Sequence, residues 1–128
     1  MKKFSFISIL LIMLTFCLKS EAMTFAEAYN KSSSKPAVVF VYADWADNYQ
    51  TLQRRFRAVQ ARLSGKFNFV EVNLANKDAK LLNSIYYIYP NLPYVFLIRN
   101  NGKVTKHITR DCLSSTSCLM EKISTFTP

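Results

Sequence analysis

Apolar residues gather in three short runs along the chain, separated by longer segments in which they recur at wider spacing. The runs are Ala37–Tyr42 (AVVFVY), Phe67–Leu74 (FNFVEVNL) and Tyr94–Arg99 (YVFLIR). Their length and their content of β-branched and aromatic residues are typical of strands. The first run contains no strongly polar position, which indicates a strand buried on both faces of a sheet that helices cover.

The segment 47–63 has the strongest helical pattern. Its apolar residues recur three or four positions apart and form one stripe: Tyr49, Leu52, Phe56, Val59 and Leu63. Such a stripe predicts an amphipathic helix, and Gly65 follows where a C-terminal cap is expected. Nearer the N-terminus, Thr24–Glu27 fits a capping box and predicts a short helix to about Asn30.

The remaining elements complete an alternating order. Asn76 is expected to cap another helix. Four positions of that helix are expected to face inward: Leu81, Leu82, Ile85 and Tyr86. Asn100-Asn101-Gly102 predicts a hairpin turn, followed by a return strand over 103–109 and a final helix over 119–126. This order predicts an α/β sandwich with a mixed sheet.

The first 22 residues have the pattern of a secretory signal peptide. Lys2-Lys3 provides a positive start, and an apolar run follows over residues 4–18. Ser20 and Ala22 then place small residues at the −3 and −1 positions of a cleavage site after Ala22. We therefore expect a cleaved, exported protein, periplasmic if the host is a Gram-negative bacterium, with one domain over 23–128.

Two other interpretations of this segment stay open. The apolar run is shorter than the roughly 20 residues of a spanning helix, but an uncleaved membrane anchor is compatible with it. Cys17 would be the attachment point of a lipoprotein anchor. Lipoprotein signals place a small residue before the cysteine, and here Phe16 stands there.

Composition and charge bound the function. Half of the residues are hydrophobic and 14% are aromatic, which excludes general disorder. Cleavage after Ala22 would turn 17 basic and 8 acidic residues into 14 and 7, a net charge of +7. A basic exported protein suits an acidic partner or peripheral contact with an anionic membrane. Nucleic acid is not an expected partner outside the cytoplasm, and the oligomeric state is left open.

Several strings lie in the order found in a known family. Tyr42–Trp45 (YADW) closes the first strand, Asn91-Leu92-Pro93 precedes the third apolar run, and Asn101-Gly102 lies in the hairpin. Together they resemble the thioredoxin superfamily, in particular the C-terminal periplasmic domain of thiol:disulfide interchange proteins. The resemblance covers nearly all of residues 23–128. It implies a thioredoxin-like sandwich with a central mixed four-stranded sheet flanked by helices, and a cis-proline loop at Pro93.

The chain departs from the family at the redox motif. Redox-active members carry Cys-x-x-Cys directly after the tryptophan, where this chain has Ala46-Asp47-Asn48-Tyr49. Thiol–disulfide exchange needs a thiolate nucleophile and a resolving thiol. Many members also carry a buried aspartate five residues before the tryptophan, and here that position is Phe40. The resemblance thus implies the fold without an oxidoreductase at this position, and we do not expect an enzyme.

The same resemblance implies a surface for protein contacts. In the family the redox motif and the cis-proline loop are adjacent and grip extended peptide. The expected site comprises Trp45, Ala46, Asp47, Asn48, Tyr49, Leu92 and Pro93. Tyr89 is a further candidate for the apolar aromatic patch. Such patches are common anchors for partner proteins, so an envelope or exported protein is the expected partner, with inherited packing as the alternative.

Cys112 and Cys118 are the thiols that would remain after cleavage. An even count in an oxidising compartment favours a structural disulfide, and five intervening residues differ from the two of a redox motif. Free thiols and a relocated redox pair stay open. The leading hypothesis is therefore a non-catalytic interaction module, for example an accessory component of a secretion or envelope assembly. The alternatives are a divergent oxidoreductase using this pair and a periplasmic peptide-binding chaperone.

Other candidate chemistry is sparse. His107 is expected at the surface, without acidic or thiol neighbours at metal-ligand spacing. The sequence contains no glycine-rich phosphate loop, so no cofactor and no metal are expected. Four arginines lie on the predicted helix after the altered motif: Arg54, Arg55, Arg57 and Arg62. They form either a solvated helix face or a basic strip that docks an acidic partner or anionic lipid.

Overall fold

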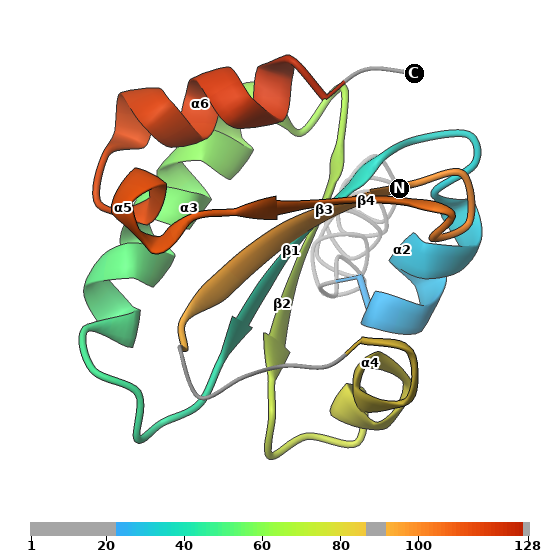
Figure 1. Cartoon of the computed structure of the whole chain (residues 1–128), viewed down its shortest axis with the longest axis horizontal. Coiled ribbons are helices and arrows are strands. Elements are labelled where there is room, and N and C mark those ends of the chain that lie inside the picture. The colour runs from blue at the N-terminus through green and yellow to red at the C-terminus, as the bar shows by residue number, and fades with distance from the viewer. Residues whose placement is uncertain (1–22, 87–91, 127–128) are drawn as a thin grey trace, which may run out of the picture.

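Four strands form one mixed sheet at the centre of the computed structural model, which describes residues 23–86 and 92–126 (Figure 1). The strands are β1 (Ala37–Tyr42), β2 (Asn68–Asn73), β3 (Tyr94–Arg99) and β4 (Val104–Ile108), in the order β2-β1-β3-β4. β1 pairs in parallel with β2 and antiparallel with β3, and β3 pairs antiparallel with β4. The expected mixed four-stranded sheet is confirmed.

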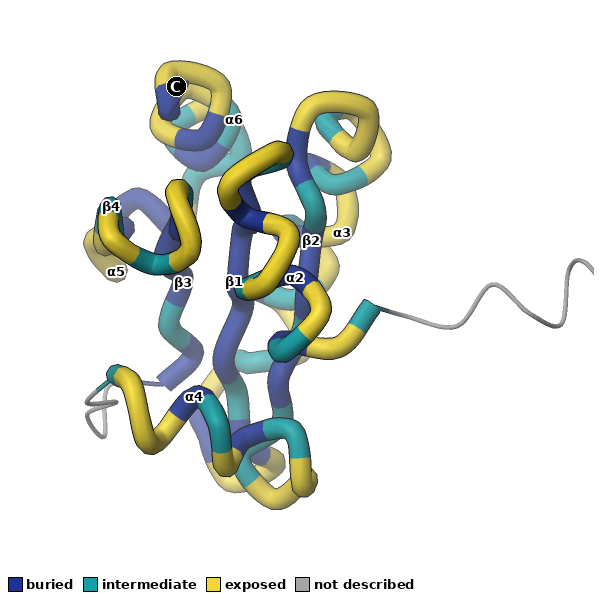
Figure 2. The backbone as a smooth tube through the Cα atoms, turned by 90° about the vertical axis from the view of Figure 1, so that its right-hand side faces the viewer, coloured by how far each residue is buried: buried dark blue, intermediate teal, exposed yellow. Residues whose placement is uncertain are grey.

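Within the described residues, five helices cover the two faces of the sheet. They are α2 (Phe25–Lys31), α3 (Tyr49–Leu63), α4 (Ala79–Ile85), α5 (Arg110–Leu113) and α6 (Thr116–Ser124). α3, α5 and α6 share one hydrophobic cluster with the sheet, and α2 and α4 share the other. Figure 2 shows mostly buried residues along β1, β2 and β3, and helices that carry many exposed residues. The α/β sandwich is therefore confirmed.

The alternation of side chains along β1 explains the two cores. Val38 and Phe40 lie in the cluster with α3, whereas Val39 and Val41 lie in the cluster with α2 and α4. Both sets are fully buried, as a strand with period-two side chains between two helical layers requires. The uninterrupted apolar run AVVFVY thus follows from the central place of β1 in the sheet.

Some boundaries differ from those expected. The N-cap of α4 is Asp78 rather than Asn76, because the amide oxygen of Asn73 accepts from the Ala75 N–H and holds a turn before the helix. Ile85 does not face inward but is 40% exposed, since it ends the helix. The hairpin at 100–102 is confirmed, with positive φ at all three residues.

The C-terminal region also differs. The short helix α5 was not expected, and α6 begins at Thr116 rather than near Leu119. Ser115 is the N-cap of α6, and its hydroxyl accepts a hydrogen bond of 3.3 Å from the Cys118 N–H. A serine side chain that satisfies an unpaired N–H group is the usual start of a helix. Within residues 23–86 and 92–126, no helix is long and apolar enough to cross a membrane.

Candidate functional site

The sheet register brings residues 46–49 and the proline loop to the same end of the molecule. Val41 near the end of β1 pairs with Tyr94 at the start of β3. The residues that follow Val41 therefore lie beside the residues that precede Tyr94. Ala46 and Leu92 belong to the same hydrophobic cluster. The Leu92–Pro93 peptide bond is cis, as the family resemblance implied.

The side chain of Trp45 is the most exposed large hydrophobic group in the described part of the chain. Its residue is 69% exposed, and Ile85 at 40% is the other large hydrophobic residue in this class. Trp45 lies in the loop between β1 and α3, next to buried Ala46 and exposed Asp44 and Asp47. An exposed indole beside polar groups offers both apolar area and a hydrogen-bond donor to a partner.

Tyr49 is held in place by a ring stack at the start of α3. Its ring lies 5.4 Å from that of Tyr42, with an angle of 12° between the planes. Asn48 before it has a φ of 59°, a left-handed conformation that asparagine tolerates better than most residues. Tyr49 is half-buried, so this ring serves the packing of the loop as well as its surface.

The two residues of the proline loop that the structure describes are buried. Leu92 is 4% exposed and Pro93 is buried as well. Arg110 at the start of α5 donates from Nη1 to the Leu92 carbonyl oxygen across 2.9 Å. Tyr89 and Asn91 lie outside the described residues. Among the expected apolar residues of the site, Trp45 therefore presents the largest exposed surface.

Two polar clefts flank the first turn of α3. The first, of about 420 Å³, is lined by residues 44–51. The second, of about 390 Å³, lies between α3 and α5 and includes Arg55 and Arg110 in its lining. Asn48 and Thr51 line both clefts, so the two share the first turn of the helix as a common wall.

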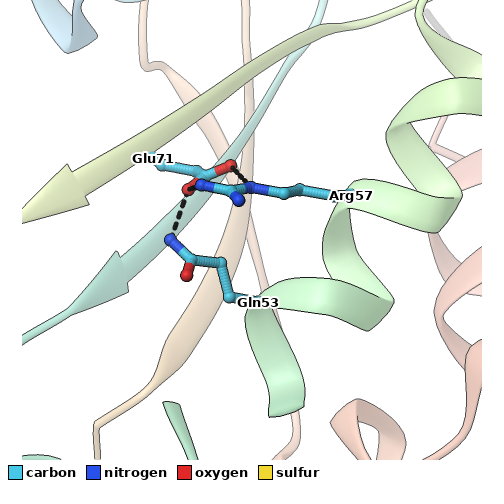
Figure 3. Close-up of polar contacts among 3 residues, drawn as sticks. All are labelled: Gln53, Arg57 and Glu71. Atoms are coloured by element: carbon cyan, nitrogen blue, oxygen red, sulfur yellow. Dashed lines mark hydrogen bonds and ion pairs between the residues drawn. The ribbon is translucent and has the colours of Figure 1, made fainter. Parts of the chain in front are cut away.

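The expected basic strip on α3 is divided by an acidic residue of the sheet. Glu71 on β2 accepts two hydrogen bonds from Arg57, of 2.8 Å from Nε and 2.9 Å from Nη2, and one of 2.5 Å from Gln53 (Figure 3). The hydrogen bonds and charge of Glu71 raise the pKa of the Arg57 guanidinium. Arg57 thus belongs to a local contact between helix and sheet, while Arg54 and Arg62 are exposed.

Cys112 and Cys118 form a disulfide, as the even cysteine count predicted. Their Cα atoms are 5.3 Å apart, and the bond joins α5 to α6. Cys112 is buried and lies in the cluster with α3. The bond therefore fixes the short, unexpected helix α5 to the last helix.

His107 is exposed, as expected, and its Nδ1 shares a hydrogen bond with the Tyr94 hydroxyl. Within the described residues, no group of three histidine, cysteine or acidic side chains lies where it could hold a metal ion. Sequence reasoning missed Arg110 as a site residue, because no motif marks it and only the fold brings α5 next to the start of α3.

No protein-family model matches the chain, and no curated protein matches it in sequence. Solved structures match it well in shape. The J-Trx1 fragment of ERdj5 has 17% identity over 80% of this chain and 48% of its own length, with a TM-score of 0.63. Thioredoxin from Fasciola hepatica has 17% identity over 77% of this chain and 86% of its own, with a TM-score of 0.56.

A third match is the structure of the first two thioredoxin domains of Saccharomyces cerevisiae Eps1p. It has 16% identity over 70% of this chain and 34% of its own length, with a TM-score of 0.55. The chain therefore has a thioredoxin-like fold, and the expected fold class is confirmed. It spans about half the length of the ERdj5 fragment, at 48%. Similarity at this level of identity establishes the fold, and the function has to be argued from the site.

Proposed function

We propose that this chain is an exported, redox-inactive, thioredoxin-like interaction module that binds another envelope or exported protein through the surface around Trp45. The observation that carries the proposal is the exposure of Trp45, at 69%, in a loop whose neighbour Ala46 is buried. Keeping a large aromatic side chain in water forgoes the burial that most aromatic residues obtain on folding. An exposed aromatic group next to polar clefts is a common anchor of protein interfaces.

The chemistry of the same loop supports the absence of redox activity. Residues 46–49 contain no thiol or other strong nucleophile, and exchange requires a thiolate. Phe40, at the position where many redox members carry an aspartate, is fully buried and its ring lies 5.1 Å from that of Phe56. The disulfide of Cys112 joins two helices, a place suited to a structural bond.

Export is part of the proposal, with cleavage after Ala22 and a periplasmic location. The first described helix supports this boundary. Thr24 is its N-cap and accepts from the Glu27 N–H, and the Phe25 N–H donates to Asp78 across 2.7 Å. Cleavage after Ala22 would leave these contacts intact. Fractionation of cells and N-terminal sequencing test it: a mature protein beginning at Met23 supports the proposal, and an uncleaved membrane-bound form contradicts it.

The binding proposal is tested by chemical cross-linking in intact envelopes, followed by affinity capture and mass spectrometry. Three proteins are compared: wild type, Trp45→Ala and Ile85→Ala. The Ile85 variant is the matched control, because it removes the other exposed large hydrophobic residue of the described chain. We expect one or a few stoichiometric envelope proteins with wild type and Ile85→Ala, and their loss with Trp45→Ala. Capture that survives Trp45→Ala in a folded variant contradicts the site.

The other two hypotheses give different outcomes. A broad spectrum of unfolded exported chains, with suppression of aggregation at near-stoichiometric ratios, would favour a chaperone. Reduction of insulin by wild type but not by Cys112→Ser, beside a Cys-x-x-Cys thioredoxin as positive control, would favour an oxidoreductase. We expect neither activity.

A further inference from the structure

The cleft between α3 and α5 has two arginines in its lining. Arg55 reaches it from α3 and Arg110 from the first residue of α5. Asp111 is the acidic residue in its lining, and Thr51 and Ser114 add hydroxyl groups. Two guanidinium groups against one carboxylate leave a formal charge of +1, in a cleft of about 390 Å³.

Within the described part of the chain, these two arginines use few of their N–H donors. Arg110 uses Nη1 for the Leu92 carbonyl, and a guanidinium has five N–H donors. Among the described residues, the ion pair is that of Arg57 and Glu71, and neither Arg55 nor Arg110 is paired with Asp111. The hydrogen bond to Leu92 fixes the position of Arg110 without neutralising its charge.

The cleft is also connected to the proposed binding surface. Asn48 and Thr51 line it on one side and line the cleft of Trp45 on the other. Asn48, Thr51 and Arg55 are three and four residues apart, so they follow one another along the same face of α3. An extended segment bound at Trp45 can therefore continue past Thr51 to Arg55.

We infer that the Arg55–Arg110 cleft binds the carboxylate of an acidic side chain in an extended segment of the partner protein, whose apolar side chain covers Trp45. The inference rests on the proposed function, because it names the chemistry of the partner at that same surface. Guanidinium groups match the planar carboxylate with paired N–H donors. The single net positive charge of the lining suits a carboxylate better than a dianionic phosphate.

The test is a titration of the purified protein with short blocked peptides that contain one phenylalanine and one glutamate, separated by glycine spacers of increasing length. The same peptides with glutamine in place of glutamate are the ligand control. Binding is followed by the fluorescence of Trp45, the sole tryptophan, and by NMR resonances of the Arg55 side chain. We expect the best glutamate peptide to bind roughly tenfold more tightly than its glutamine counterpart, as loss of a charged hydrogen bond implies.

Variants of the protein complete the test. Arg55→Gln is expected to abolish the preference for glutamate, whereas Arg54→Gln, an exposed neighbour outside the cleft lining with the same change of charge, keeps it. Asp111→Asn is expected to tighten binding of the glutamate peptide severalfold, because it removes a repelling carboxylate. That gain in affinity cannot arise from loss of folding.

The outcomes separate the two proposals. Equal binding of glutamate and glutamine peptides, or equal effects of Arg55→Gln and Arg54→Gln, overturns the carboxylate cleft. If Trp45→Ala still abolishes binding in that case, the interaction surface stands. A glutamate preference that survives Trp45→Ala supports the cleft and contradicts the Trp45 surface. No binding of either peptide at millimolar concentration, or equal affinity for free acetate, overturns the assignment to an acidic peptide.

Discussion

Arg110 donates a hydrogen bond of 2.9 Å from Nη1 to the carbonyl oxygen of Leu92, the residue before the cis proline. One side chain thus connects the start of α5 to the loop that leads into β3. Leu92 precedes the start of β3, which pairs with the end of β1, and it shares a hydrophobic cluster with Ala46. The proline loop therefore has a fixed partner on the α3 side of the sheet.

Replacing Arg110 with glutamine should weaken this connection. The carbonyl of Leu92 would lose a charged donor in a partly buried place, and we expect the free energy of unfolding to fall by about 1–2 kcal/mol. Urea unfolding measures the change, and hydrogen exchange should show lower protection at the start of β3. Arg54→Gln serves as the control for the loss of charge. Equal stability of the two variants would show that the hydrogen bond contributes nothing measurable.

The disulfide between α5 and α6 should be stabilising but not functional. It closes a loop with a sequence separation of 6 residues, and chain-entropy estimates for so short a loop give about 2 kcal/mol. We expect the free energy of unfolding of the double variant Cys112→Ser/Cys118→Ser, measured in urea, to be lower by that amount. The variant should still capture the partner that wild type captures. Loss of capture in a folded double variant would contradict a purely structural role.

Much of the fold followed from local pattern. The uninterrupted apolar run AVVFVY predicted that β1 is buried between two layers of helices. The apolar stripe through Leu52 and Phe56 predicted a helix that packs with one face on the sheet. The boundaries of the last helix did not follow. The four residues of α5 are too few to leave a periodic signal in the sequence. Ser115 follows closely after this helix, so its role as the N-cap of α6 could not be told from that of a loop serine.

The candidate site was predictable only in part. The resemblance located Trp45 and Pro93, since these lie in strings of adjacent residues. Arg110 and Glu71 were missed as determinants of the site because their partners are distant in sequence. Arg110 meets Leu92 eighteen residues away, and Glu71 meets Arg57 fourteen residues away. Such contacts depend on the order of the strands and on the placement of the helices, and a local sequence pattern predicts neither.

The turn after β3 offers a test with an internal control. Gly102 has a φ of +82°, and a Cβ built there would lie 2.5 Å from Cε2 of Tyr29. Gly102→Ala should therefore combine backbone strain with a clash and lower the free energy of unfolding by about 1–3 kcal/mol. A Cβ at Gly65 would meet no atom within 4 Å, so Gly65→Ala should change stability by less than about 1 kcal/mol. Equal effects at the two glycines would contradict this account.

Tyr86 should make stability fall at alkaline pH. Burial raises the pKa of its phenol above the ordinary value of 10.0, and the hydrogen bond with Thr105 opposes this shift only in part. The folded state then holds the proton more tightly than the unfolded state. The contribution of this raised pKa to the free energy of unfolding is fully present below pH 10 and is lost as the pH rises through the folded-state pKa.

Tyr86→Phe isolates this effect, because it removes this one phenol and leaves every other ionisable group of the chain in place. The phenylalanine keeps the ring that packs 4.8 Å from that of Phe96 and removes the titrating hydroxyl. Losing the hydrogen bond to Thr105 should cost about 1 kcal/mol near neutral pH. Urea unfolding at several values between about pH 8 and pH 11 should show this difference shrinking as the pH rises. A difference that stays constant across this range would mean that the Tyr86 phenol titrates alike in the folded and unfolded states.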